Sequence, residues 1–135
     1  MLCCTAILAI KPTDPLNEYF QNSPGKNLDQ KLALASKLFL NKPYALSPLG
    51  EGVFGKFNQK PIYSLEEFDC QTYVSTVLAL IWSDAIANFL PNMLMIRYHG
   101  NHQATYLQRN HFPSIDWLPN AYKLKILTDI TDKLY

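Results

Sequence analysis

The protein has 135 residues and a formal net charge of +1, with 48% hydrophobic and 17% charged residues. This length and composition predict one globular domain with a hydrophobic core and argue against a disordered chain. The near-neutral charge and the scattered Lys and Arg residues argue against a nucleic acid or an anionic membrane surface as the partner.

The first ten residues, MLCCTAILAI, are apolar and are comparable to the central part of a secretion signal. No basic segment precedes this run, no clear cleavage site follows it, and it is too short to span a bilayer. A signal that has lost its front, a lipoprotein-like start and a buried element stay open as interpretations. Because residues 11–27 hold three prolines, we expect residues 1–27 to form an apolar N-terminus and an irregular connection.

The next segment, residues 28–40, repeats apolar residues at the spacing of one helix face. Asn27 is a plausible cap at the start of this helix, and Pro43 stops it. Residues 44–63 hold three of the five glycines, so we expect a long loop with one short strand.

A second helix is predicted from Cys70 onward, because apolar residues again fall on one helical face: Tyr73, Val74, Val77, Leu78 and Ile81. Asp69 suits its cap position, which places Cys70 at the first helical position.

After Pro91 the pattern changes to strand-like runs. Residues 93–100 and 104–112 flank the polar turn GNHQ and predict an antiparallel hairpin. Residues 112–122 are expected to form a loop, and residues 124–131 one further strand.

Cys70 is the first candidate for chemistry. A helix N-terminus lowers the pKa of a thiol from its usual value of about 8.5 and supplies backbone amides that stabilise an oxyanion. The alternative is a free cysteine that only packs in the core, which is the more common situation.

A cysteine nucleophile needs a histidine that takes and returns the proton. His111 is the best placed of the three histidines, with Asp116 and Asn120 close behind as orienting groups. A structural histidine at the end of a strand is the alternative. Arg97 and Arg109 could hold a carboxylate through bidentate hydrogen bonds, and surface solvation is their ordinary role.

The three cysteines do not form a disulfide framework, since Cys3 and Cys4 are adjacent. The sequence has no C-x-x-C, no H-E-x-x-H and no histidine pair at helical spacing, so we expect neither a metal nor a cofactor.

Read together, several segments resemble a known family over roughly residues 35–131. The resemblance is to the bacterial N-acetylmuramoyl-L-alanine amidase-like family, among the NlpC-type, papain-like cysteine peptidases. It is carried by KPY (42–44), FDCQTYVSTVLAL (68–80), IRYHG (96–100), YLQRNHF (106–112), DW (116–117) followed by Asn120, and TDIT (128–131).

The resemblance implies hydrolysis of the amide between N-acetylmuramic acid and L-alanine in peptidoglycan or muropeptides, in the periplasm or cell envelope. It implies that Cys70 is the nucleophile and that a substrate cleft includes Tyr44, Arg97, Arg109, Asp116 and Trp117. The implied fold is α+β and papain-like, with helices packed on an antiparallel sheet. Residues 28–135 would form a partial amidase-like domain.

The sequence also departs from the family. The family continues past the DIT segment to a His-x-Gly strand that supplies the general base, whereas this sequence contains no His-x-Gly. We therefore expect an incomplete sheet and weak or absent activity: either the sequence is a fragment or a truncated product, or His111 has to substitute for the missing base. The other hypotheses are a non-catalytic module that binds muropeptides and a truncated protein without activity.

Overall fold

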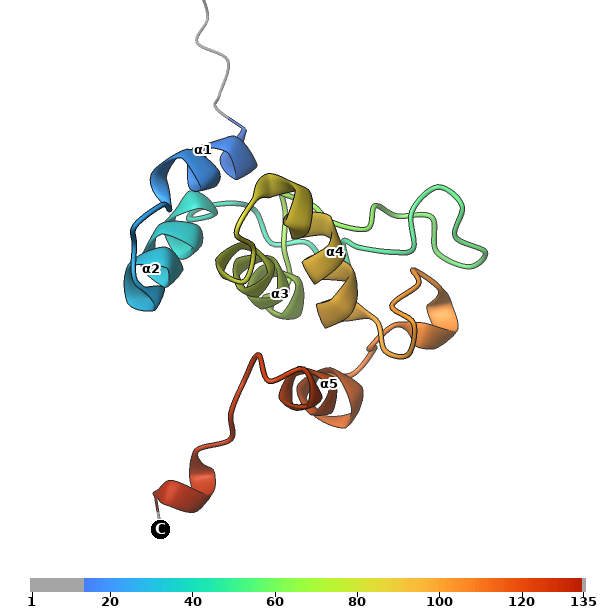
Figure 1. Ribbon diagram of the computed structural model, residues 1–135. Helices are drawn as coiled ribbons and strands as arrows, with labels where there is room; N and C mark the ends of the chain where they lie inside the picture. Colours follow the sequence, from blue (N-terminus) through green and yellow to red (C-terminus); the bar gives the residue numbers. More distant parts are fainter. Residues whose placement is uncertain (1–13, 135) are drawn as a thin grey trace, which may run out of the picture.

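The computed structural model describes residues 14–134, and within this range the chain is helical (Figure 1). The five α-helices are α1 (Pro15–Asn22), α2 (Leu28–Leu38), α3 (Cys70–Ile81), α4 (Ile86–Arg97) and α5 (Leu118–Lys123). Three shorter helical turns follow α4 along the chain: η1 (Tyr106–Gln108), η2 (Pro113–Trp117) and η3 (Thr131–Lys133). None of the helices between residues 14 and 134 is both long and apolar enough to cross a bilayer.

Helix α3 lies at the centre of the bundle. It packs against α2 on one side and α4 on the other, and α1 contacts both α2 and α4 (Figure 1). The core includes Tyr19 from α1, Leu80 from α3, and Phe89 and Met93 from α4, each almost completely buried. Burying a side chain of this size stabilises a fold by about 1.5–3 kcal/mol.

The expected α+β fold with an antiparallel sheet is wrong for the described residues. Between residues 14 and 134 the β pairing consists of two isolated bridges, Tyr44 with Phe68 and Tyr98 with Arg109. The papain-like sheet that the resemblance implied is therefore absent from this part of the chain.

The first strand of the expected hairpin is the second half of α4. Phe89, Met93 and Ile96 are buried at a spacing of four and three residues, which is one face of a helix. Pro91 lies inside this helix, so the change to strand-like structure expected after Pro91 does not occur there. The polar turn does reverse the chain, since the His99 N–H donates to Gln108 O at 2.9 Å, but the pairing ends after the Tyr98–Arg109 bridge.

The expected strand at residues 124–131 is also wrong. The chain leaves α5 through a turn in which the Ile126 N–H donates to Ala121 O at 3.0 Å and Lys125 has a positive φ of 58°. It then runs away from the helices toward η3 (Figure 1), and no neighbouring strand among the described residues pairs with it.

Part of the expected irregular connection is helix α1. Asp14 caps it by accepting a hydrogen bond from the Leu16 N–H at 3.1 Å, and Pro15 occupies the first turn, where its missing N–H costs nothing. Residues 1–13, including Cys3, Cys4 and the apolar start, lie outside the described residues. The division of the chain at residue 27 therefore stays a prediction.

The predicted helices α2 and α3 and the long loop are confirmed, but the short strand expected within the loop is absent, since the β pairing of residues 44–63 is the isolated Tyr44–Phe68 bridge. Asn27 forms a capping box with Gln30 at the start of α2, and Cys70 is the first residue of α3. The loop of residues 44–63 folds back on itself, because the Glu51 N–H donates to Asn58 O at 2.9 Å.

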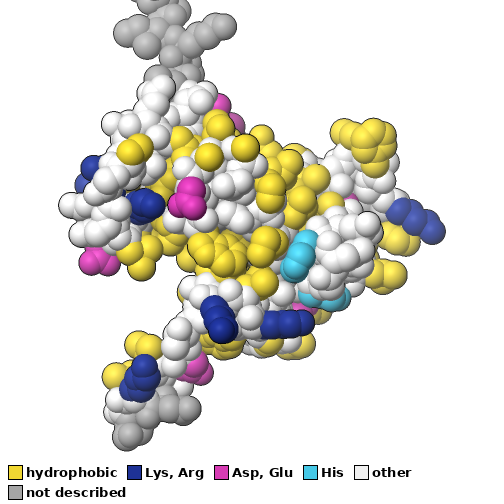
Figure 2. Space-filling view, viewed as in Figure 1, with side chains coloured by type: hydrophobic (Ala, Val, Ile, Leu, Met, Phe, Trp, Pro, Cys, Tyr) yellow, Lys and Arg dark blue, Asp and Glu magenta, His cyan; other side chains and the backbone are white. Residues whose placement is uncertain are grey.

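This loop projects from the bundle (Figure 1), and its outer part carries exposed side chains, Val53, Phe54 and Phe57. Hydrophobic side chains at its tip are visible in Figure 2. Its inner part behaves differently, since Leu49, Gly50 and Glu51 are buried against the helices.

Candidate functional site

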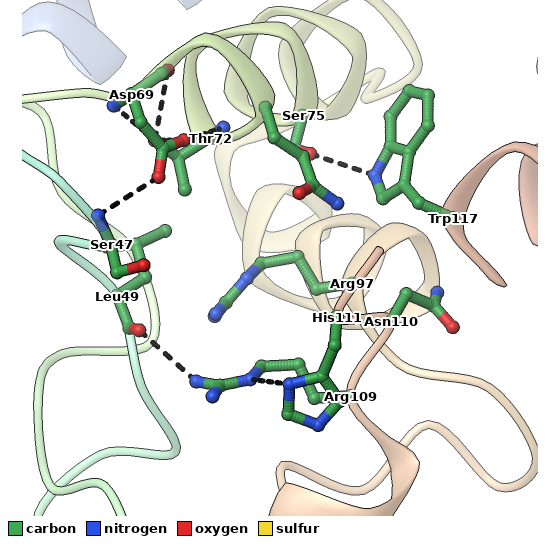
Figure 3. A pocket seen from close by; sticks show the side chains of 11 residues that line it. Ser47, Leu49, Asp69, Thr72, Ser75, Arg97, Arg109, Asn110, His111 and Trp117 are labelled. Atoms are coloured by element: carbon green, nitrogen blue, oxygen red, sulfur yellow. Dashed lines mark hydrogen bonds between the residues drawn. The ribbon is translucent and has the colours of Figure 1, made fainter. Parts of the chain in front are cut away.

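A cavity of about 110 Å³ lies at the N-terminal end of α3 (Figure 3). Its walls come from three parts of the chain that are far apart in sequence: the inner part of the loop, the first turns of α3, and the segment that follows α4. The lining residues are Ser47, Leu49, Asp69, Gln71, Thr72, Ser75, Arg97, Arg109, Asn110, His111 and Trp117.

Asp69 fixes the start of α3. Its Oδ1 accepts hydrogen bonds from the Thr72 N–H and from the Thr72 hydroxyl, both at 2.8 Å, and Thr72 Oγ1 accepts one from the Asp69 N–H at 2.9 Å. Its Oδ2 accepts a hydrogen bond from the Ser47 N–H at 3.2 Å. The carboxylate therefore joins the helix to the loop across the cavity.

Cys70 is exposed, so the alternative of a packed core cysteine is wrong. Its side chain is not part of the cavity lining, although both neighbours, Asp69 and Gln71, are. The N–H groups of Cys70 and Gln71 have no hydrogen-bond partner among residues 14–134. Because the first amides of a helix lack internal partners, these two N–H groups can receive a ligand oxygen.

Arg97, on the last turn of α4, is only 6% exposed and lines the cavity. Its Nη1 donates to Gly50 O at 3.3 Å and to Ile62 O. Burial lowers the pKa of the Arg97 guanidinium from its usual value. Within residues 14–134 no carboxylate lies at ion-pair distance from it.

Arg109 is the second cation of the cavity wall. Its Nη1 lies 2.9 Å from Glu51 Oε1 and donates to Leu49 O at 3.3 Å. Glu51 is only 4% exposed, and neither of its carboxylate oxygens has a well-directed hydrogen bond among the described residues. Figure 3 shows Arg97 and Arg109 near one another, beneath the start of α3.

His111 lines the cavity, whereas His99 and His102 do not. Its Nε2 lies 2.7 Å from Tyr106 O, so this nitrogen carries the proton. Its Nδ1 then accepts a hydrogen bond from Arg109 Nε at 3.4 Å (Figure 3). Both ring nitrogens are thus engaged.

Neither expected orienting group holds the ring of His111. Asp116 accepts hydrogen bonds from the backbone N–H of His111 at 2.9 Å and of Phe112 at 2.8 Å, so it shapes the main chain at the start of η2. The Asn120 side chain donates to Met95 O at 3.0 Å and to Ile96 O at 3.3 Å, which ties α5 to α4.

A family model described as N-acetylmuramoyl-L-alanine amidase-like matches residues 34–135. The chain belongs to this amidase-like family. No curated protein matches it significantly.

Among solved structures, this amidase-like chain is similar to the crystal structure of protein LPG0564 from Legionella pneumophila str. Philadelphia 1, described as a DUF1460 protein. The two share 34% sequence identity with a TM-score of 0.80. The match covers 86% of this chain but only 38% of the Legionella protein.

The other expected cleft residues of the amidase-like chain take different positions. Trp117 lines the cavity, with its Nε1 donating to Ser75 Oγ at 3.1 Å. Tyr44 is 71% exposed and lies outside the lining, although its backbone pairs with that of Phe68, two residues before Cys70.

Glu51, the buried counter-ion of Arg109, was not among the residues expected from the sequence. Its position between Gly50 and Gly52 was a signal in the sequence. A side chain at Gly50 would collide with Asn58, and one at Gly52 would lie close to Ile62, so the loop is tightly packed at this point. Asn110, which lies between two of the expected residues, was also not among them. No group of three His, Cys, Asp or Glu side chains that could hold a metal ion occurs in residues 14–134.

Proposed function

We propose that this chain supplies the nucleophile and part of the substrate cleft for cysteine-dependent hydrolysis of the N-acetylmuramoyl–L-alanine amide in peptidoglycan or its fragments. The observation that carries the proposal is the exposed Cys70 at the first position of a capped helix, between two residues that line a cavity. Membership of the amidase-like family supports the bond type. Since peptidoglycan lies in the cell wall, the periplasm or cell envelope is the proposed location.

In the proposed reaction, the Cys70 thiolate attacks the carbonyl carbon of the amide. The unpartnered N–H groups of Cys70 and Gln71 donate to the oxygen that becomes negative. The C–N bond then breaks, the L-alanine nitrogen takes a proton, and water hydrolyses the thioester to release the acid and the free thiol. The positive end of the α3 dipole stabilises both anions.

His111 is the candidate base, because it is the histidine that lines the cavity. Its position is poor for this role, since protonation of Nδ1 would end the hydrogen bond from Arg109 Nε. General-base catalysis contributes about 10²–10⁴-fold to a rate. We expect His111→Asn to lower the rate less than tenfold, and the isolated chain to be a slow enzyme.

The test is the release of L-alanyl peptides from purified muropeptides, measured by mass spectrometry. Cys70→Ala and Cys70→Ser should abolish the release, whereas the matched variant Cys3→Ser/Cys4→Ser should retain it. Equal rates for the unaltered chain and Cys70→Ala would remove Cys70 from the mechanism.

A second candidate function is muropeptide binding without catalysis. It is favoured by one observation, that the cavity is lined by two cations while the Cys70 side chain is not part of the lining. In that case, muropeptide affinity measured by calorimetry is unchanged by Cys70→Ala and reduced by Arg109→Ala, and no peptide is released.

A further inference from the structure

The charges on one wall of the cavity, those of Arg97, Arg109 and Glu51, do not balance, and the fourth charge, that of Asp69, lies on the opposite wall. Two buried or half-buried guanidinium groups, those of Arg97 and Arg109, share one buried carboxylate, that of Glu51. Two positive charges and one negative charge leave the cluster at +1. Buried charges in proteins are ordinarily paired, so a cluster of this kind is completed by an anion.

Arg97 has unused donors. The hydrogen bonds that it makes, to Gly50 O and Ile62 O, come from Nη1. Its Nε and Nη2 donate to no carbonyl or carboxylate oxygen among residues 14–134, although the guanidinium also interacts with the Tyr98 hydroxyl, and its side chain lines the cavity. Nε and Nη2 of one guanidinium form the planar pair of donors that matches a carboxylate.

The cavity has room for such a group. Its volume of about 110 Å³ exceeds the share of one water molecule, about 30 Å³, by several times. Asp69, the carboxylate on the opposite wall, accepts hydrogen bonds from the Ser47 N–H and from the N–H and hydroxyl of Thr72. These neutral donors hold the Asp69 carboxylate in place without cancelling its charge, so an incoming anion is attracted only close to Arg97 and Arg109.

We propose that this cavity is a carboxylate-binding subsite, in which Arg97 and Arg109 hold a free carboxylate of the amide substrate beside the bond that Cys70 attacks. A single carboxylate matches the cluster's charge of +1, whereas a dianionic phosphate would exceed it. The substrate is thus an acidic peptide amide. This inference rests on the proposed function for the identity of the substrate, but binding of the carboxylate does not require the thiol.

The experiment uses the full chain with Cys70→Ala, which removes turnover, and two probes of nearly equal size. N-acetyl-L-alanyl-D-isoglutamine carries one carboxylate, and the corresponding diamide is neutral. Calorimetry at low salt should give at least tenfold tighter binding of the acid than of the diamide. Equal affinities would overturn the subsite, and this comparison needs no variant of the cluster. Inorganic phosphate serves as a third probe, and preference for it over the acid would overturn the assignment to a carboxylate.

Glu51→Gln gives a second test, because this variant should bind the acid probe more tightly although it is less stable. Removing the counter-ion raises the cluster from +1 to +2, so the variant should melt at a lower temperature alone and bind the acid probe more tightly. Adding the acid probe should therefore raise the melting temperature of Glu51→Gln by more than it raises the melting temperature of the parent chain. The matched control is Glu66→Gln, because Glu66 forms an exposed ion pair with Lys42 at 2.7 Å outside the cavity and should leave the affinity unchanged. Weaker binding by folded Glu51→Gln would contradict the proposal.

The two proposals fail in different ways. Acid binding together with turnover that survives Cys70→Ala would overturn the nucleophile and leave the subsite standing. Turnover that depends on Cys70 but proceeds equally on acidic and amidated muropeptides would overturn the subsite alone.

Discussion

Asp69 and Ser47 lie 22 positions apart in the sequence and are joined by a hydrogen bond of 3.2 Å from the Ser47 N–H to Asp69 Oδ2. The other oxygen of the same carboxylate caps α3 through the Thr72 N–H at 2.8 Å. One side chain therefore sets both the helix end that carries Cys70 and the loop wall that faces it.

The first prediction is that Asp69→Ala lowers the free energy of unfolding by about 1 kcal/mol, the usual effect of losing a helix cap. It should also weaken binding of the acid probe, because the loss of the hydrogen bond between loop and helix outweighs the loss of one negative charge from the cavity wall. Urea denaturation and calorimetry measure the two effects.

Asn27→Ala is the matched control, since Asn27 caps α2 through the Gln30 N–H at 2.9 Å and lies outside the cavity. It should show a similar loss of stability with unchanged probe affinity. If Asn27→Ala weakened binding as much as Asp69→Ala, the link between cap and loop would not be what holds the cavity.

The sequence predicted the start of α3 because the signals there are local. A cap residue, its reciprocal partner Thr72 and an apolar face all lie within a few residues of Cys70. It failed for α4 because a strand-like pattern was expected after Pro91, which separated Phe89 from Met93 although both are buried on one face of the same helix.

The candidate site was predicted in part. The predicted hairpin placed Arg97 and Arg109 on neighbouring segments of the chain. No strands form there, but the isolated Tyr98–Arg109 bridge still brings the two segments together. Apart from the two flanking glycines, the sequence held no signal for the burial of Glu51, because this burial depends on the long loop folding against α4 across more than forty residues. Such long-range packing leaves no periodic signal in the chain.

The second prediction concerns the buried pair of Trp117 and Ser75, whose Nε1 and Oγ lie 3.1 Å apart. Ser75→Ala leaves the indole N–H buried without a partner, which costs about 1–3 kcal/mol. Trp117→Phe removes the donor as well as part of the packing. In thermal denaturation, the double variant should lose about 1 kcal/mol less than the sum of the single losses. Additive losses would show that the hydrogen bond adds nothing to stability.

The third prediction uses one chemical change at two buried tyrosines. The Tyr98 hydroxyl donates to Gly50 O at 3.0 Å, whereas the Tyr19 hydroxyl has no partner among the described residues. Tyr98→Phe should therefore lower the free energy of unfolding by about 1 kcal/mol, and Tyr19→Phe should leave it unchanged or raise it. Chemical denaturation at neutral pH compares the two variants directly, and a destabilised Tyr19→Phe would contradict the assignment.

The same two tyrosines affect how the free energy of unfolding changes at alkaline pH. Burial raises the pKa of Tyr98 and of Tyr19 above the usual value of 10.0. The unfolded chain therefore loses these protons first, so stability should be constant up to about pH 10 and fall as the pH rises further. Tyr98→Phe should reduce this fall in denaturation curves measured up to pH 11. An unchanged pH slope would contradict the contribution of Tyr98.

The fourth prediction concerns Gly50, whose carbonyl accepts hydrogen bonds from both Arg97 and Tyr98. A Cβ at this position would lie 2.7 Å from Asn58 O, closer than real contacts allow, so the backbone of the loop must move. Gly50→Ala should cost about 1–3 kcal/mol of stability and weaken binding of the acid probe, because Arg97 loses its fixed position.

The control is Gly25→Ala, where φ is +74° and no atom lies within 4 Å. That variant should lose about 1–2 kcal/mol from backbone strain alone and keep its affinity. Calorimetry on both folded variants separates the two mechanisms, since unchanged affinity in Gly50→Ala would show that Arg97 is not positioned by the loop.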